Sequence, residues 1–125
     1  MKRFLPVGRR LVESRFSLMS FLNSRQRSLI DRIGAMVDSV EARMMLGTVG
    51  LYDSDSSDQP FGLLEGDAFY LLADADARDV FESGGATPVQ AGSPGPDKTF
   101  FRVPPEVSGS DQLNAWVEHA IRAAS

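Results

Sequence analysis

The sequence predicts an α+β domain in which helices pack against a mostly antiparallel sheet. Two observations carry this prediction. Apolar residues recur at helical spacing near the start of the chain, briefly in its middle and again at its end. Between these segments lie short apolar runs, rich in aromatic residues and bounded by turn residues, which are typical of strands joined in two hairpins or a meander.

The composition is that of a globular protein with a single core. The chain has 125 residues, of which 42% are hydrophobic and 24% charged, enough to bury a core without disulfides or metals. It has no cysteine, which excludes disulfides, a thiol nucleophile and thiolate metal sites. No apolar run approaches the roughly 18 residues of a membrane span, so we expect a cytoplasmic protein.

Charge is divided unevenly along the chain. Residues 1–25 hold six cations and one anion, a net charge of +5, within a protein whose net charge is −4. The rest of the chain therefore carries −9. An acidic body repels phosphate backbones, so we expect no nucleic-acid binding through it. The basic arm, by contrast, could contact nucleic acid or another anionic surface.

Residues 1–24 are rich in Arg and Ser and form a basic extension to a domain that we expect to span residues 25–125. Several interpretations stay open. The extension could pack on the domain, contact an anionic partner, or be an organelle-targeting presequence, which would change the expected localisation. Translation could also begin later, since Met19 is a second candidate start.

The first element of the domain is a helix over residues 25–40. Ser28 and Asp31 form a candidate capping box near its start. Its apolar residues fall on one stripe, which indicates packing on a core: Leu29, Ile33, Met36, Val37 and Val40.

The stretch that follows, residues 42–52, carries Gly47 and Gly50 between apolar residues. We expect a strand that bends or bulges at the two glycines, continues to Tyr52 and leads into a hairpin. A phosphate-binding loop is disfavoured because the Lys-Ser/Thr of a P-loop is missing.

The first hairpin pairs residues 61–65 with residues 68–73. The tight turn between them is Gly66-Asp67, because glycine tolerates positive φ and aspartate tolerates it better than most residues.

A short helix follows the first hairpin, over residues 75–83. Asp74 is its N-cap, and it ends at Gly84-Gly85. We expect this helix to bury Val80 and Phe81.

The second hairpin pairs residues 88–91 with residues 98–103 and ends at Pro104-Pro105. The last element is a helix that begins after Ser110 or Asp111. Its apolar face consists of Leu113, Trp116, Val117, Ala120, Ile121 and Ala124.

The glycine stretch resembles a family signature. Ala42–Tyr52 reads ARMMLGTVGLY and is similar to the Arg-x-Met-Phe-Gly-x-x-Gly-Leu-Tyr motif of the TfoX/Sxy N-terminal domain. Further motifs follow in the family's order: FYLLAD at 69–74, RDVFESGG at 78–85, FFRVP at 100–104, and Leu113 with Trp116. The similarity extends over about residues 25–125. Leu46 and Leu72 depart from the usual phenylalanine and the usual basic residue, and the loop 53–60 is longer and more acidic.

The resemblance implies a single α+β domain named for regulators of natural competence. In the full-length regulators a second domain follows, and they act in transcription with the cyclic-AMP receptor protein. The N-terminal domain has no established catalytic role. Because this sequence ends with the final helix, we expect a stand-alone, non-enzymatic member that works through an unidentified protein partner.

Seven residues are candidates for partner contacts or for structural roles in the motif: Arg43, Met45, Gly47, Gly50, Tyr52, Tyr70 and Arg102. The two arginines lie in or beside apolar strands, so we expect each to pair across the sheet with a carboxylate or a helix C-terminus. The tyrosines are expected to be core aromatics with the hydroxyl at the rim. The glycines are expected to shape the backbone.

The sequence indicates no catalytic, cofactor or metal site. His119 is the only histidine and has no visible partner that would make it a general base. The acidic loop from Asp53 to Asp58 resembles the start of a calcium loop, but Asp58 stands where the sharp turn needs glycine. Two alternatives to a regulatory domain remain: a binder of nucleic acid or anionic surfaces through residues 1–25, and a small-ligand binder or enzyme with a pocket near Arg43 and Arg102.

Overall fold

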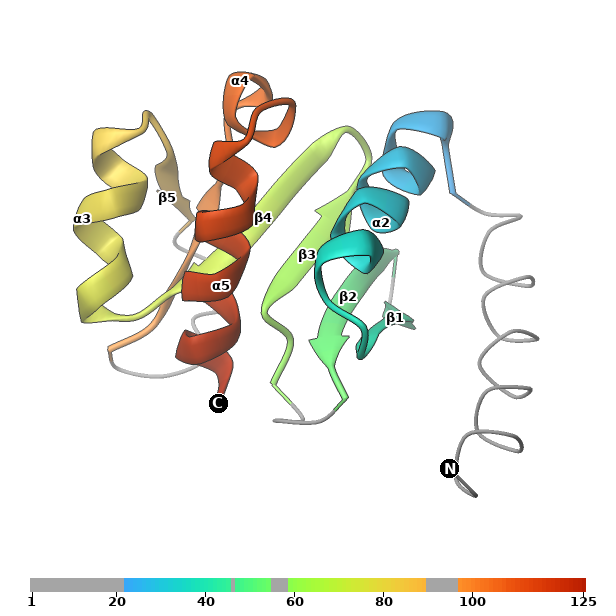
Figure 1. Ribbon diagram of the computed structural model, residues 1–125, viewed down its shortest axis with the longest axis horizontal. Coiled ribbons are helices and arrows are strands. Elements are labelled where there is room, and N and C mark those ends of the chain that lie inside the picture. Colours follow the sequence, from blue (N-terminus) through green and yellow to red (C-terminus); the bar gives the residue numbers. More distant parts are fainter. Residues whose placement is uncertain (1–21, 46, 55–58, 90–96) are drawn as a thin grey trace.

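The computed structural model describes residues 22–45, 47–54, 59–89 and 97–125 (Figure 1). The helices are α2 (Ser24–Met36), α3 (Ala75–Ser83), α4 (Pro105–Ser108) and α5 (Gln112–Ala124). The strands are β1 (Val40–Met45), β2 (Thr48–Asp53), β3 (Gly62–Glu65), β4 (Ala68–Ala73), β5 (Thr87–Val89) and β6 (Thr99–Arg102). The predicted α+β class is confirmed.

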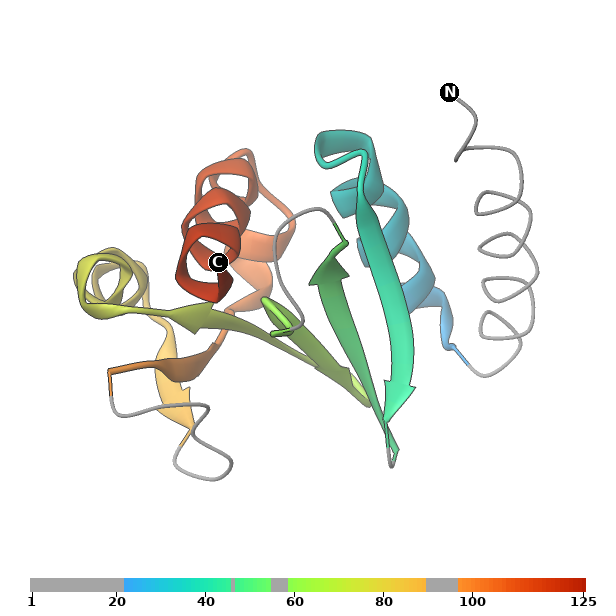
Figure 2. The ribbon, with the colours of Figure 1, turned by 90° about the horizontal axis from the view of Figure 1, so that it is seen from below.

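One antiparallel sheet contains all six strands, in the order β1-β2-β3-β4-β6-β5. Strands β1 to β4 form a meander, and β5 and β6 form a separate hairpin whose inner strand, β6, pairs with β4. The four described helices lie on one side of this sheet (Figure 2). The sheet therefore has a helix-covered face and a face that no described helix covers.

The core fills the space between the helices and the sheet. Phe81 of α3 stacks on Trp116 of α5, with ring centroids 4.6 Å apart and planes 26° apart. Phe101 of β6 meets Phe81 edge-on at 5.9 Å. We call Phe81, Phe101 and Trp116 the aromatic cluster. It joins helices α3 and α5 to the sheet through stacked and edge-on contacts, the arrangements that aromatic pairs prefer.

Helix α2 begins earlier and ends earlier than its apolar stripe predicted. Asn23 caps it by accepting a hydrogen bond from the Gln26 backbone N–H at 2.8 Å, and the Gln26 side chain accepts one from the Asn23 N–H at 3.0 Å. This capping box replaces the predicted pair Ser28 and Asp31. The helix ends at Met36 because Val37 is extended, so Val40 belongs to strand β1.

The glycine stretch is a hairpin rather than one bent strand. Strands β1 and β2 pair from Val40 with Asp53 to Met45 with Thr48, so the chain turns back between Met45 and Thr48. Gly47 has φ of +86°, a left-handed conformation that glycine adopts without strain. Gly50 lies in the regular middle of β2, so the predicted bend there is wrong.

Helix α3 has the predicted bounds, and Asp74 accepts a hydrogen bond from the Ala77 N–H at 3.0 Å. Phe81 is fully buried as expected, but the prediction for Val80 is wrong, since 38% of its surface is exposed. Helix α4 was not predicted. Pro105 stands in its first turn, where proline loses no helical hydrogen bond.

Gly84 makes the closest backbone approach to the aromatic cluster. A Cβ at this position would lie 2.3 Å from Cζ2 of Trp116, whose ring is held in the core by Phe81. We predict that Gly84→Ala lowers the free energy of unfolding by about 1–3 kcal/mol, the usual cost of overpacking. Urea denaturation followed by tryptophan fluorescence measures it.

The matched control is Gly34→Ala in α2, where a Cβ would meet only Val40 Cγ1 at 3.7 Å. This change should raise the free energy of unfolding by about 0.5–1 kcal/mol, because alanine is the better helix former. Equal stability of Gly84→Ala and the wild type would contradict the close packing of α3 on α5.

Candidate functional site

The sheet face turned away from the helices carries most of the predicted site residues. Strand pairing aligns one row across five strands: Arg43, Gly50, Leu63, Tyr70 and Arg102. The adjacent row contains Phe101, whose ring packs against Phe81 of α3. Since successive side chains of a strand point to opposite faces, the Arg43–Arg102 row points away from the helices. We call this surface the open face.

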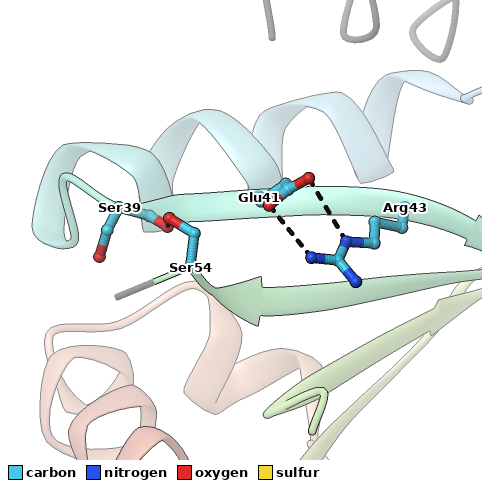
Figure 3. A network of polar contacts seen from close by, with 4 residues as sticks. All are labelled: Ser39, Glu41, Arg43 and Ser54. Carbon is cyan, nitrogen blue, oxygen red and sulfur yellow. Dashed lines mark hydrogen bonds and ion pairs between the residues drawn. The ribbon is translucent and has the colours of Figure 1, made fainter. Parts of the chain in front are cut away.

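Arg43 is held at one end of the row by two neighbours. Its Nε lies 3.3 Å from Oε2 of Glu41, two residues earlier on the same strand, and its Nη2 lies 3.4 Å from Oε1 (Figure 3). Its guanidinium also covers the ring of Tyr52 on β2, 4.2 Å from the centroid. Arg43 does pair with a carboxylate, but one on its own strand and not across the sheet as expected, and 45% of its side chain is exposed.

The Glu41–Arg43 pair lies near the open end of the β1–β2 hairpin. There the Ser39 carbonyl accepts hydrogen bonds from the Ser54 backbone N–H at 3.0 Å and from its hydroxyl at 2.9 Å (Figure 3). The Ser39 hydroxyl donates to Asp53 Oδ1. These bonds fix the end of the hairpin and with it the position of Glu41.

Arg102 stands at the other end of the row, on β6. It is exposed, and no residue in the described ranges forms a hydrogen bond or ion pair with its guanidinium, so the expected pairing is wrong for this arginine. Tyr70 pairs with it directly across the strands and is half-buried. Four strand spacings of about 4.8 Å separate Arg43 from Arg102, roughly 19 Å in all.

The remaining three predicted site residues lie outside the Arg43–Arg102 row. Gly47 lies in the hairpin turn, with open space around the position of a Cβ. Met45 is the last residue of β1, and its side chain lies outside the described residues. Tyr52 is buried, with 7% of its surface exposed, but it lies on the open face beneath the guanidinium of Arg43 and not in the core under the helices.

The sequence also raised a metal site and His119 as candidates, and the structure gives their surroundings within the described residues. No three His, Cys, Asp or Glu side chains gather there as metal ligands. His119 packs edge-on against Phe81 and lies 3.3 Å from Arg122. Residues 55–58 of the acidic loop, which resembles a calcium loop, lie outside the described residues. No described helix is long and apolar enough to cross a membrane.

A pocket of about 430 Å³ lies on the opposite side of the sheet, between α2 and α4, and neither Arg43 nor Arg102 lines it. The sequence did not reveal this pocket. Its α2 residues, Arg25, Ser28, Leu29 and Arg32, do recur at helical spacing, but three of the four are polar. The apolar stripe of this helix was the clearer pattern in the sequence, and it predicted packing on the core and not a pocket.

The chain was compared with protein families, curated proteins and solved structures. The family model described as the TfoX N-terminal domain matches residues 32–124. Neither the curated proteins nor the solved structures gave a match.

Substitutions of Gly47 test whether this residue is needed for the shape of the turn. We predict that Gly47→Val lowers the free energy of unfolding by about 1–2 kcal/mol, since a β-branched residue is strained at positive φ. Gly47→Asn should cost clearly less, because asparagine tolerates this conformation. Thermal unfolding of both variants measures the difference, and a Gly47→Val variant as stable as the wild type would refute the role in the turn.

Proposed function

Because the chain belongs to the TfoX N-terminal domain family, we propose that it is a non-enzymatic protein-interaction domain that acts in regulation of the transcriptional or competence type. The observation that supports this most is the open face. It presents Arg43, Leu63, Tyr70 and Arg102 in one row on a sheet whose other side is covered by helices.

The residue types on this row suit a protein partner. Tyrosine and arginine are enriched in protein interfaces, where they supply much of the binding energy. Half-buried Leu63 and Tyr70 give the middle of the row an apolar surface, and an exposed cation stands at each end. A partner that places an apolar or aromatic patch over Tyr70 and a carboxylate beside Arg102 would complement it.

Single-stranded nucleic acid fits the open face less well. Bases stack on exposed aromatic rings, but Tyr52 is 7% exposed and Arg43 covers its ring. Glu41 already neutralises part of the charge of Arg43. Residues beyond the first 25 carry a net charge of −9, which opposes the approach of a phosphate backbone.

The test is capture of a partner by the full chain and by Arg102→Glu and Arg43→Glu/Arg102→Glu variants. We expect a protein partner that resists nuclease treatment and is lost with Arg102→Glu and with the double variant, because charge reversal opposes the partner's carboxylates. Quantitative binding of the identified partner should weaken at least tenfold, about 1.4 kcal/mol.

Arg122→Glu is the matched control, since Arg122 is an exposed arginine on α5 in the helix layer. It should bind like the wild type. Equal capture by Arg102→Glu and Arg122→Glu would refute the open face as the binding surface.

A second candidate function follows from the charge of the N-terminus. Residues 1–25 carry a net charge of +5, so binding to nucleic acid through this arm should weaken steeply with salt. Residues 1–21 lie outside the described residues. We predict that removing them abolishes any such binding in a mobility-shift assay. Salt-insensitive binding, or binding unchanged by the deletion, would exclude the arm.

A further inference from the structure

We propose that the pocket between α2 and α4 binds a small amphipathic molecule with one carboxylate and an apolar tail. Its volume of about 430 Å³ falls within the roughly 300–1,000 Å³ of small-molecule sites. The pocket opens beside the β3–β4 turn and lies on the helix side of the sheet. It is therefore separate from the open face, and the proposal does not depend on the proposed function.

Apolar side chains from four parts of the chain meet in the pocket. Leu29 of α2, Phe69 of β4, Val103 after β6 and Pro105 of α4 all line it. Phe69 and Val103 are almost fully buried, so the pocket reaches the edge of the core. An alkyl or aryl tail placed here would move from water to an apolar wall, and the burial of that apolar surface favours binding.

One wall of the pocket carries donors suited to an anion. Arg25, Ser28 and Arg32 line it from α2 and, at intervals of three and four residues, lie along one side of that helix. Arg32 is fixed in place: its Nη1 donates to the Ser108 carbonyl at 3.2 Å and its Nη2 to the Ser110 carbonyl at 2.9 Å. A guanidinium has five N–H groups, so the two bonds leave donors on Arg32.

Among the residues that line the pocket, Arg25 gives the strongest reason to expect an anionic ligand. It is exposed and forms no hydrogen bond or ion pair with any residue of the described ranges. It also lies in the first turn of α2, which contains no acidic residue. A cation is disfavoured at the positive end of a helix dipole. An anion in the pocket would offset both the charge of Arg25 and the positive end of the α2 dipole.

Asp67 limits the charge of the ligand. It lines the same pocket from the β3–β4 turn, so two cations face one carboxylate there. A ligand with a single negative charge matches this balance, whereas a polyphosphate would meet repulsion from Asp67. The apolar wall and the single net charge together favour a monocarboxylate with a hydrophobic tail.

The test is titration of octanoate into the full, ¹⁵N-labelled chain, below the concentration at which octanoate aggregates. We expect saturable chemical-shift changes centred on Leu29, Phe69 and Ser108. Octanol and inorganic phosphate, which each lack one half of the chemistry, should bind at least tenfold more weakly. No saturable change, or changes centred elsewhere, would overturn the proposal, as would octanol or phosphate binding as well as octanoate.

A pair of variants tests the role of the cation. Arg25→Gln should weaken octanoate binding about tenfold, the loss of one charge-assisted hydrogen bond. Its melting temperature should not fall, because Arg25 has no bond to lose within the described residues and its charge is disfavoured at the start of α2. Arg122→Gln, far from the pocket on α5, is the control and should bind like the wild type. Equal affinities of the two variants would refute the contact with Arg25.

Discussion

The stacking of Phe81 on Trp116 is the contact on which most of the architecture depends. The two rings come from α3 and α5, and Phe101 adds an edge-on contact from β6. The three segments lie far apart in the sequence, so this cluster closes long loops whose entropy cost must be offset by burial. Gly84 allows the close approach, because any side chain there would meet the Trp116 ring. With α3 and α5 held on one face, the other face of the sheet has no described helix to cover it.

Local chemistry predicted much of the fold. The bounds of α3 followed from Asp74 and Gly84, and the β3–β4 turn followed from Gly66, whose φ is +59°. The errors occurred where two local signals competed. The apolar stripe of α2 continues past Met36, yet the chain becomes extended at Val37, and Val40 instead begins strand β1 and pairs with Asp53. The two prolines at 104 and 105 indicated the end of a strand, and nothing in them distinguished this from the start of helix α4.

The candidate site was predictable residue by residue but not as a surface. Arg43, Tyr70 and Arg102 stood out as unusual residues in apolar strands. Their alignment in one row depends on the register of four strand pairs, which no local pattern contains. The partner of Arg43 was also beyond sequence reasoning, because Glu41 lies on the same strand and not across the sheet. The pocket was missed for a related reason: it exists only where α2 and α4 face each other.

Strand β1 is the outer strand of the sheet, so one side of its backbone has no strand partner among the described residues. Such an edge can pair with the same edge of another molecule and start aggregation. Glu41 and Arg43 place charges along this strand, and charged side chains are a common defence against such pairing. The opposite edge, β5, is three residues long and contains Pro88, which has no N–H to offer a new strand. Both edges of the sheet thus carry features that oppose edge-to-edge growth, in a domain whose open face no described helix covers.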